Sequence, residues 1–165
     1  MTTRAWTIGT NPGVRTMQPK ILFLDVHGVL GPLVDRGSRE FEPACVEQFN
    51  RIVDETGAKI VLTSSLRGLI HSGHMDLYGF TALLRTHGIH GEVFGTTGCN
   101  RDEVPRWKLL VEWLTAHQHS RWVILDDNPD ACPPFNCSAG FMVQTDPKVG
   151  LTAADADAAI SWLKV

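Results

Sequence analysis

The stretch that decides the fold of this chain is Ile21-Leu22-Phe23-Leu24-Asp25-Val26-His27-Gly28-Val29-Leu30. Four apolar residues run directly into an acid, and a His and a Gly follow that acid. An uninterrupted apolar run of this kind is typical of a parallel strand that is buried on both faces. The strand is predicted to end at Asp25, and open α/β sheets bind their ligands at the carboxyl ends of their strands. Asp25 is therefore a candidate nucleophile.

The rest of the chain alternates between strand and helix patterns. Apolar runs predict strands, while apolar stripes at helical spacing, with Pro near the start or Gly at the end, predict helices. We expect strands at residues 20–24, 59–62, 91–94, 121–125 and 141–145, and helices at 42–56, 76–87, 105–117 and 152–164. Helices between strands favour right-handed βαβ units. The predicted fold is α/β: a doubly wound, Rossmann-like, mainly parallel five-stranded sheet with helices on both faces.

The composition indicates one globular domain. The chain has 165 residues, of which 43% are hydrophobic and 20% charged, with a net charge of -3. Residues 1–19 are polar and aperiodic, so we expect an N-terminal arm followed by one catalytic domain over 20–165. The charge predicts no broad basic face, so a nucleic-acid partner stays open without being indicated. No apolar stretch is long enough for a membrane span. The four cysteines are irregularly spaced and no export signal is present, so we expect reduced thiols and a cytoplasmic location.

The predicted strand ends carry the side chains that phosphoryl transfer requires. A carboxylate can attack phosphorus, and a hard cation such as Mg²⁺ must then bridge the carboxylate and the phosphate. Hydroxyl groups and a cationic side chain hold the remaining phosphate oxygens. Asp25 and His27 follow the first predicted strand, and Thr63 and Ser64 follow the second. Asp126 and Asp127 follow the fourth strand, and Lys108 lies near the start of the helix that precedes it.

The order and spacing of these residues resemble the motifs of the haloacid dehalogenase-like (HAD) superfamily, whose members are mostly magnesium-dependent phosphatases. The first motif, an apolar run followed by Asp-x-Asp-Gly, is matched by Asp25-Val26-His27-Gly28. The second, an apolar run ending in Thr or Ser, is matched by Ile60-Val61-Leu62-Thr63-Ser64-Ser65. The fourth, a strand followed by two acids, is matched by Val123-Ile124-Leu125-Asp126-Asp127. Lys108 is the best match to the third-motif Lys, and Arg106 is its rival.

The resemblance extends from residue 20 to about residue 165. Within the superfamily, the segment from Val143 to Thr152 is similar to small, stand-alone bacterial members that are related to the HAD domains of RNA-repair proteins. Many other members insert a cap domain next to these motifs. Here residues 31–41 are too few for a cap, and residues 66–104 are accounted for by one helix, one strand and loops. We therefore expect a capless enzyme with an open site.

The resemblance also implies roles for the candidate residues. Asp25 would be the nucleophile and a ligand of Mg²⁺. The backbone carbonyl of His27 would be the second protein ligand and Asp127 the third. Asp126 would either support Asp127 without contacting the metal or exchange roles with it. The remaining candidates are the phosphate-binding residues Thr63, Ser64 and Lys108 and the substrate contacts Arg67 and Arg106.

His27 stands where phosphatases of this family carry a second Asp. That carboxyl protonates the leaving group and then activates the attacking water. Imidazolium can donate a proton and imidazole can accept one in the physiological pH range, so His27 is able to replace it. We favour a magnesium-dependent phosphomonoester hydrolase with His27 as general acid/base. An HAD enzyme with altered, non-phosphatase chemistry and a catalytically impaired phosphate-binding or interaction module both stay open.

The open site leaves the size of the substrate undecided. A phosphorylated small molecule and a phosphorylated macromolecule are both compatible with a capless domain. A homo-oligomer, in which a neighbouring copy covers the site, also stays open.

Overall fold

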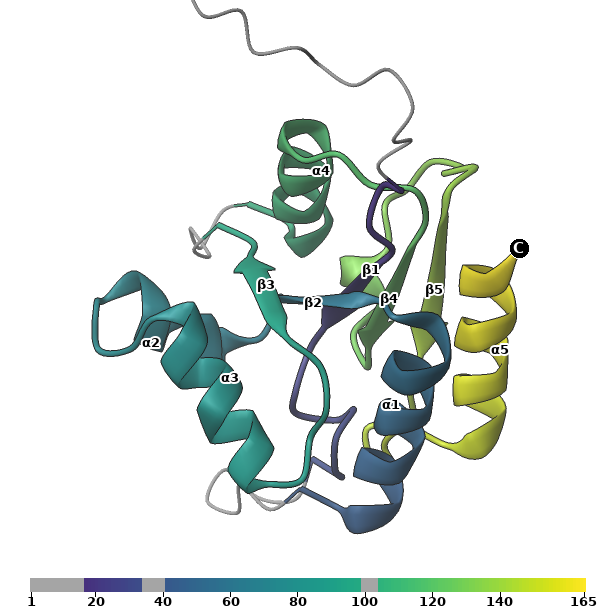
Figure 1. The fold of residues 1–165 in the computed structure, drawn as a ribbon. Coiled ribbons are helices and arrows are strands. Elements are labelled where there is room, and N and C mark those ends of the chain that lie inside the picture. Colours follow the sequence, from purple (N-terminus) through teal and green to yellow (C-terminus); the bar gives the residue numbers. More distant parts are fainter. Residues whose placement is uncertain (1–16, 34–40, 99–103) are drawn as a thin grey trace, which may run out of the picture.

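In the computed structural model, which describes residues 17–33, 41–98 and 104–165, five strands form one parallel sheet (Figure 1). The strand order is β3-β2-β1-β4-β5, so the first strand lies at the centre. The strands are β1 (Ile21–Leu24), β2 (Lys59–Leu62), β3 (Val93–Thr96), β4 (Trp122–Asp126) and β5 (Gly140–Gln144). The α/β fold with a doubly wound parallel sheet is thus confirmed. Most of the predicted arm, residues 1–19, lies outside the described residues.

The helices cover both faces of the sheet (Figure 1). They are α1 (Pro43–Thr56), α2 (Gly68–His71), α3 (Leu77–Thr86), α4 (Arg106–Ala116) and α5 (Ala153–Lys164), with single 3-10 turns at Ser65–Arg67 and Pro129–Ala131. The sequence pattern predicted four of these helices and missed α2. A one-turn helix has too few residues to display an apolar period, which explains why α2 gave no signal.

The central strand owes its uniform apolar composition to this double cover. Leu22 and Leu24 point into a core shared with α1, α3 and α5. Ile21 and Phe23 point to the opposite face, where they pack with Leu110 and other residues of α4. All four strand residues are fully buried. Because successive side chains of a strand alternate between faces, a strand covered on both sides has no position for a polar residue.

Local capping agrees with the sequence pattern at the last helix. The hydroxyl of Thr152 accepts a hydrogen bond from the Asp155 amide, and the Asp155 carboxylate accepts one from the Thr152 amide. This reciprocal capping box satisfies two amides that a helix start leaves unpaired. The predicted start of the last helix at Thr152 is therefore explained by the cap, which directly precedes α5.

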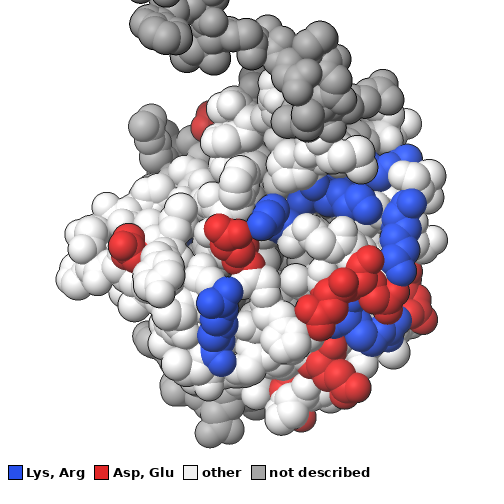
Figure 2. Space-filling view, viewed as in Figure 1, with Lys and Arg blue, Asp and Glu red and all other residues white. Residues whose placement is uncertain are grey.

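Charged side chains of both signs are mixed on the face shown in Figure 2, most densely over α1 and α5. Glu55 of α1 pairs with Lys164 of α5 at 2.6 Å, and Arg51 of α1 pairs with Asp157 of α5. Exposed pairs of this kind contribute little to stability, so burial of apolar surface holds the two helices together. Among the described residues, none of the helices combines the length and the apolar character that a membrane crossing needs.

The described residues between β2 and β3 form no separate cap domain. The chain from β2 to β3 contains one 3-10 turn, α2 and α3, which pack on the body of the domain. The carboxyl edge of the sheet therefore has no separate folded unit above it from this part of the chain.

Candidate active site

The register of the sheet brings three polar residues to one edge. Leu24 of β1 pairs with Leu62 of β2 and with Leu125 of β4. The residues that follow these three leucines are Asp25, Thr63 and Asp126. Their backbones continue the ladder, because the Asp25 amide donates to the Leu125 carbonyl at 3.0 Å and the Thr63 amide donates to the Leu24 carbonyl at 2.9 Å. The sheet itself therefore determines where these side chains lie.

Asp25 is held by one hydrogen bond on each carboxylate oxygen. It is only 6% exposed. Its Oδ1 accepts a hydrogen bond from the amide of Val26 at 2.9 Å, and its Oδ2 accepts one from Nη1 of Arg106 at 3.0 Å. These contacts orient the carboxyl group at the tip of β1, where a reacting group must be held rigidly to be effective.

Asp126 is fully buried and shares the same guanidinium. Its Oδ2 accepts a hydrogen bond from Nη1 of Arg106 at 2.6 Å, and its Oδ1 accepts one from the amide of Asn128 at 2.9 Å. Arg106 is the first residue of α4, so the start of that helix carries a cation to the ends of β1 and β4. Charge-assisted hydrogen bonds of this kind are stronger than neutral ones.

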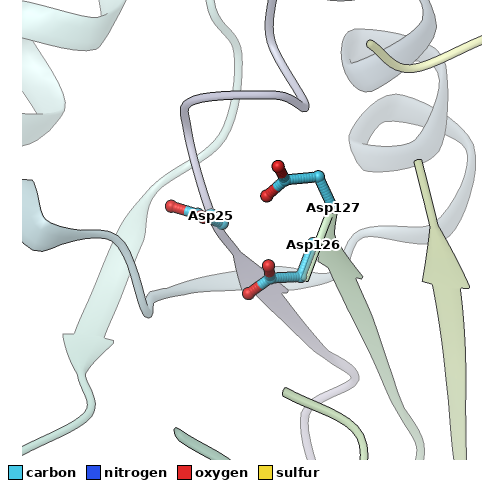
Figure 3. Close-up of side chains that lie close together, drawn as sticks. All are labelled: Asp25, Asp126 and Asp127. Carbon is cyan, nitrogen blue, oxygen red and sulfur yellow. The ribbon is translucent and has the colours of Figure 1, made fainter. Parts of the chain in front are cut away.

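Asp127 completes a cluster of three carboxylates (Figure 3). One carboxylate oxygen from each of Asp25, Asp126 and Asp127 lies within 4.8 Å of the others. Asp127 is half-buried and lies against Gly28, where a Cβ atom would come within 2.7 Å of the Asp127 carboxyl carbon. Gly28 also has φ of +77°, a conformation that side chains disfavour, so the turn after β1 requires glycine for two reasons.

The electrostatics of the cluster favour a cation at this place. Burial, and then the charge of Asp25, raise the pKa of Asp126 to about 6 although Arg106 opposes the rise. The same two causes raise the pKa of Asp127. Within the described part of the chain, Arg106 is the only guanidinium that pairs with the three carboxylates, which leaves excess negative charge. Mg²⁺ prefers carboxylate oxygens, so the donor set fits this ion.

Thr63 offers a buried hydroxyl at the end of the strand next to that of Asp25. The residue is 2% exposed, and its Oγ1 has no hydrogen-bond partner among the described residues. A buried polar atom without a partner is costly and rare in native proteins. Ser64 differs, because its Oγ accepts a hydrogen bond from the Leu66 amide at 3.3 Å and thereby caps the 3-10 turn. Of the two, Thr63 is the hydroxyl that still needs a ligand.

The structure places Arg106, rather than Lys108, at the carboxylates. Lys108 is exposed, and its Nζ lies 5.7 Å from the ring centroid of Trp107. Two residues along an α-helix are about 200° apart, so Lys108 faces away from the sheet when Arg106 faces toward it. The assignment of Lys108 as the phosphate-binding cation therefore has no geometric support. A signal was available in the sequence, because Arg106 shares its helix face with the buried residues Leu110 and Trp113.

Arg67 also differs from its expected role as a substrate contact. It is 4% exposed, and its guanidinium donates hydrogen bonds to three backbone carbonyls, those of Thr63, Ser64 and Gly98. These bonds tie the chain that follows β2 to the chain that follows β3. In this arrangement Arg67 positions the backbone of Thr63 through a hydrogen bond to its carbonyl.

His27 lies two residues after Asp25 and is half-buried. Its imidazole makes no hydrogen bond within the described part of the chain, and the residue lines an apolar pocket. The ring is thus available to a ligand. Its assignment as acid/base, and that of its backbone carbonyl as a metal ligand, stay predictions.

Two positioning residues were missed at the sequence level. The buried hydroxyl of Thr145 donates to the Gly28 carbonyl at 2.7 Å, and the Asn128 amide holds Asp126 as described above. Thr145 closes the predicted fifth strand, so its location at the same sheet edge could have been inferred. The contact with Gly28 could not, because it joins segments 117 positions apart.

A family model described as "HAD domain in Swiss Army Knife RNA repair proteins" matches residues 21–156. A crystal structure from Mesorhizobium loti, described as a "putative had-like phosphatase", shares 14% identity over 92% of this chain and 90% of that chain, with a TM-score of 0.48. A likeness at this level carries no conclusion about activity. The comparison with curated proteins found no match.

Replacing Gly28 by alanine is expected to disturb the acidic cluster as well as the turn. Gly88 is a matched control, because its φ is +74° and an added Cβ would meet no atom within 4 Å. Gly88→Ala should lower the free energy of unfolding by about 1 kcal/mol, the cost of the left-handed backbone. Gly28→Ala should lower it by at least about 1 kcal/mol more, since Asp127 must also move. Urea denaturation measures both, and equal effects would contradict the contact with Asp127.

Asp126 should make the stability of the metal-free protein depend on pH. Its pKa is raised to about 6, so its contribution to folding is full below about pH 4 and is lost as the pH rises through 6. Asp126→Asn does not titrate. Its free energy of unfolding relative to the parent should therefore rise by up to about 3 kcal/mol between pH 4 and pH 7.5. Denaturation in EDTA at both pH values tests this, and a difference that does not change with pH would refute it.

Proposed function

Because the chain belongs to the family of HAD domains in Swiss Army Knife RNA repair proteins, we propose that it is a magnesium-dependent phosphomonoester hydrolase. The observation that carries this proposal is the buried Asp25 at the centre of a sheet edge, clustered with Asp126 and Asp127 and bonded to Arg106. A rigid carboxylate beside an incomplete cation site is suited to attack on phosphorus.

In the proposed reaction Asp25 is the nucleophile and His27 moves the protons. A carboxylate oxygen of Asp25 attacks phosphorus, and the bond between phosphorus and the ester oxygen breaks. His27, as imidazolium, donates its proton to the departing oxygen, so the alcohol leaves neutral. His27, now neutral, then takes a proton from water as the water oxygen attacks phosphorus. The bond between phosphorus and Asp25 breaks, which releases inorganic phosphate and regenerates the carboxylate.

The remaining residues of the site hold charge and position the phosphate. Asp25, Asp126 or Asp127, and the carbonyl of His27 would hold the metal. When bound, Mg²⁺ would offset the repulsion between the phosphate and the Asp25 carboxylate. The unpartnered hydroxyl of Thr63 would donate to a phosphate oxygen. Ser64 is assigned to holding the loop, since its oxygen already serves as a cap.

Arg106 takes the place that the sequence pattern gave to Lys108. Its Nη1 donates hydrogen bonds to both Asp25 and Asp126. Burial lowers the pKa of Arg106, but the charges of Asp126 and Asp25 raise it by more, so the net effect is a rise. The guanidinium therefore stays charged. It would hold the Asp25 carboxylate in place and compensate the charge of the incoming phosphate.

Loss of the nucleophile should abolish turnover, and the response of His27 variants should identify the acid/base. With Mg²⁺ and a panel of phosphate monoesters between pH 5 and 9, Asp25→Asn should lower kcat by at least about 1,000-fold. His27→Gln should lower it by about 100-fold or more and remove one limb of the pH profile. Release of inorganic phosphate is the measurement.

Two outcomes of this assay would overturn the proposal. Turnover that is unaffected by Asp25→Asn would remove the assigned nucleophile. A parent without turnover that becomes active as His27→Asp would show that His27 disables or redirects the chemistry. In that case the altered-chemistry and phosphate-binding alternatives would replace the phosphatase.

Arg106 and Lys108 form a matched pair for the identity of the cation. Arg106→Ala should lower kcat/KM by about 100-fold or more, because it removes the hydrogen bonds to both Asp25 and Asp126. Lys108→Ala, one half-turn away and exposed, should change it by less than about 3-fold. Arg106→Lys should keep part of the activity that Arg106→Ala loses, because lysine keeps the positive charge but lacks the planar guanidinium that donates several hydrogen bonds. A larger loss for Lys108→Ala than for Arg106→Ala would reverse the assignment.

A further inference from the structure

An apolar pocket of about 340 Å³ lies next to the proposed active site. Its wall begins with Val26 and His27, the two residues that directly follow Asp25. The remainder comes from the 3-10 turn, α2, α3 and the residues near the start of α1, and includes Phe41, Leu66 and Leu83. The pocket is therefore continuous in sequence and in space with the tip of the central strand.

We propose that this pocket binds the organic part of the phosphomonoester, and that this part is an apolar alkyl or aryl group. The inference rests on the proposed function and names its substrate class. During hydrolysis the phosphorus lies at Asp25 and the departing oxygen lies at His27. The group attached to that oxygen must extend beyond His27, and the pocket that His27 lines is the space beside it. We call it the leaving-group pocket.

The lining of the leaving-group pocket selects for apolar groups. Among the described residues that line it, His27 and His87 are the only ones with polar side chains, and the His87 ring packs edge-on against Phe41 with centroids 4.9 Å apart. A sugar or nucleobase would bring several hydroxyl, amino and ring-nitrogen atoms into a space with few partners for them. Its volume falls within the range of small-molecule sites. An alkyl chain or an aromatic ring fits both the size and the lining.

The rim of the pocket exposes apolar side chains to water. Leu69 of α2 is 36% exposed and Leu83 of α3 is 39% exposed, and both line the pocket. Covering this surface with an apolar ligand removes it from water and contributes favourably to binding. The rim therefore offers both an entrance and binding surface, at a sheet edge that has no cap above it from the chain between β2 and β3.

Binding of non-hydrolysable n-alkylphosphonates tests the proposal without relying on turnover. Methyl-, butyl- and octylphosphonate are titrated calorimetrically into the full chain with Mg²⁺, with inorganic phosphate as the reference. We expect affinity to rise by about 2- to 4-fold for each methylene until the pocket is filled. Leu69→Gln and Leu83→Gln should weaken octylphosphonate binding by about 10-fold and leave phosphate binding unchanged. Tyr78→Gln, an exposed position of α3 outside the pocket, should change neither.

The outcomes separate this proposal from the phosphatase itself. Phosphate binding with no dependence on chain length would overturn the leaving-group pocket and leave the phosphatase standing. Tighter binding of adenosine or uridine monophosphate than of the alkyl series would likewise overturn it, in favour of a nucleotide substrate. Binding that increases with chain length, without hydrolysis of any alkyl or aryl phosphate, would support the pocket and overturn the phosphatase.

Discussion

The buried electrostatic contact between Asp25, Asp126 and Arg106 is the constraint on which the site depends. The two carboxylates belong to neighbouring parallel strands whose register places them side by side. Neither can move away, because β1 and β4 are hydrogen-bonded into the sheet and covered by helices on both faces. One guanidinium from the start of α4 bridges them, with hydrogen bonds of 3.0 and 2.6 Å. The fold thus forces like charges together and supplies only part of the compensating charge.

This imbalance connects stability with function. Asp126 and Asp127 have raised pKa values because they are buried near Asp25, so their ionisation opposes folding unless a further cation is bound. The excess negative charge at this edge favours a cation there, and the three carboxylates are a donor set that could hold one. The partnerless hydroxyl of Thr63 at the same edge is a second feature that a ligand would satisfy. Both features cost stability in the free protein, as is common at functional sites.

His27 links the charged edge to the apolar side of the domain. Its neighbour Asp25 faces the cluster of carboxylates, while its own ring lies on the wall of a pocket formed with α2 and α3. Large parts of the wall are leucine and phenylalanine side chains that also belong to or pack on the main core. The same helices that bury one face of the sheet therefore shape the pocket beside the tip of β1. Since α2 and α3 pack on the body of the domain rather than above the edge, the described residues at this edge belong to the core domain itself.

The sequence by itself determined the order of strands and helices, the doubly wound parallel sheet and the acids at its edge. These follow from local patterns: buried strands are continuous apolar runs, and polar residues directly after them must lie at the carboxyl edge. The helix face that Arg106 shares with Leu110 and Trp113 separated it from Lys108, but only the tertiary structure decided that this cation meets the carboxylates of Asp25 and Asp126. The tertiary structure also assigned Arg67 to backbone carbonyls, Thr145 to the turn at Gly28 and His27 to a pocket wall. The contacts of Arg106 with Asp25, of Arg67 with Gly98 and of Thr145 with Gly28 join segments far apart in the sequence, and local sequence patterns carry no record of such packing.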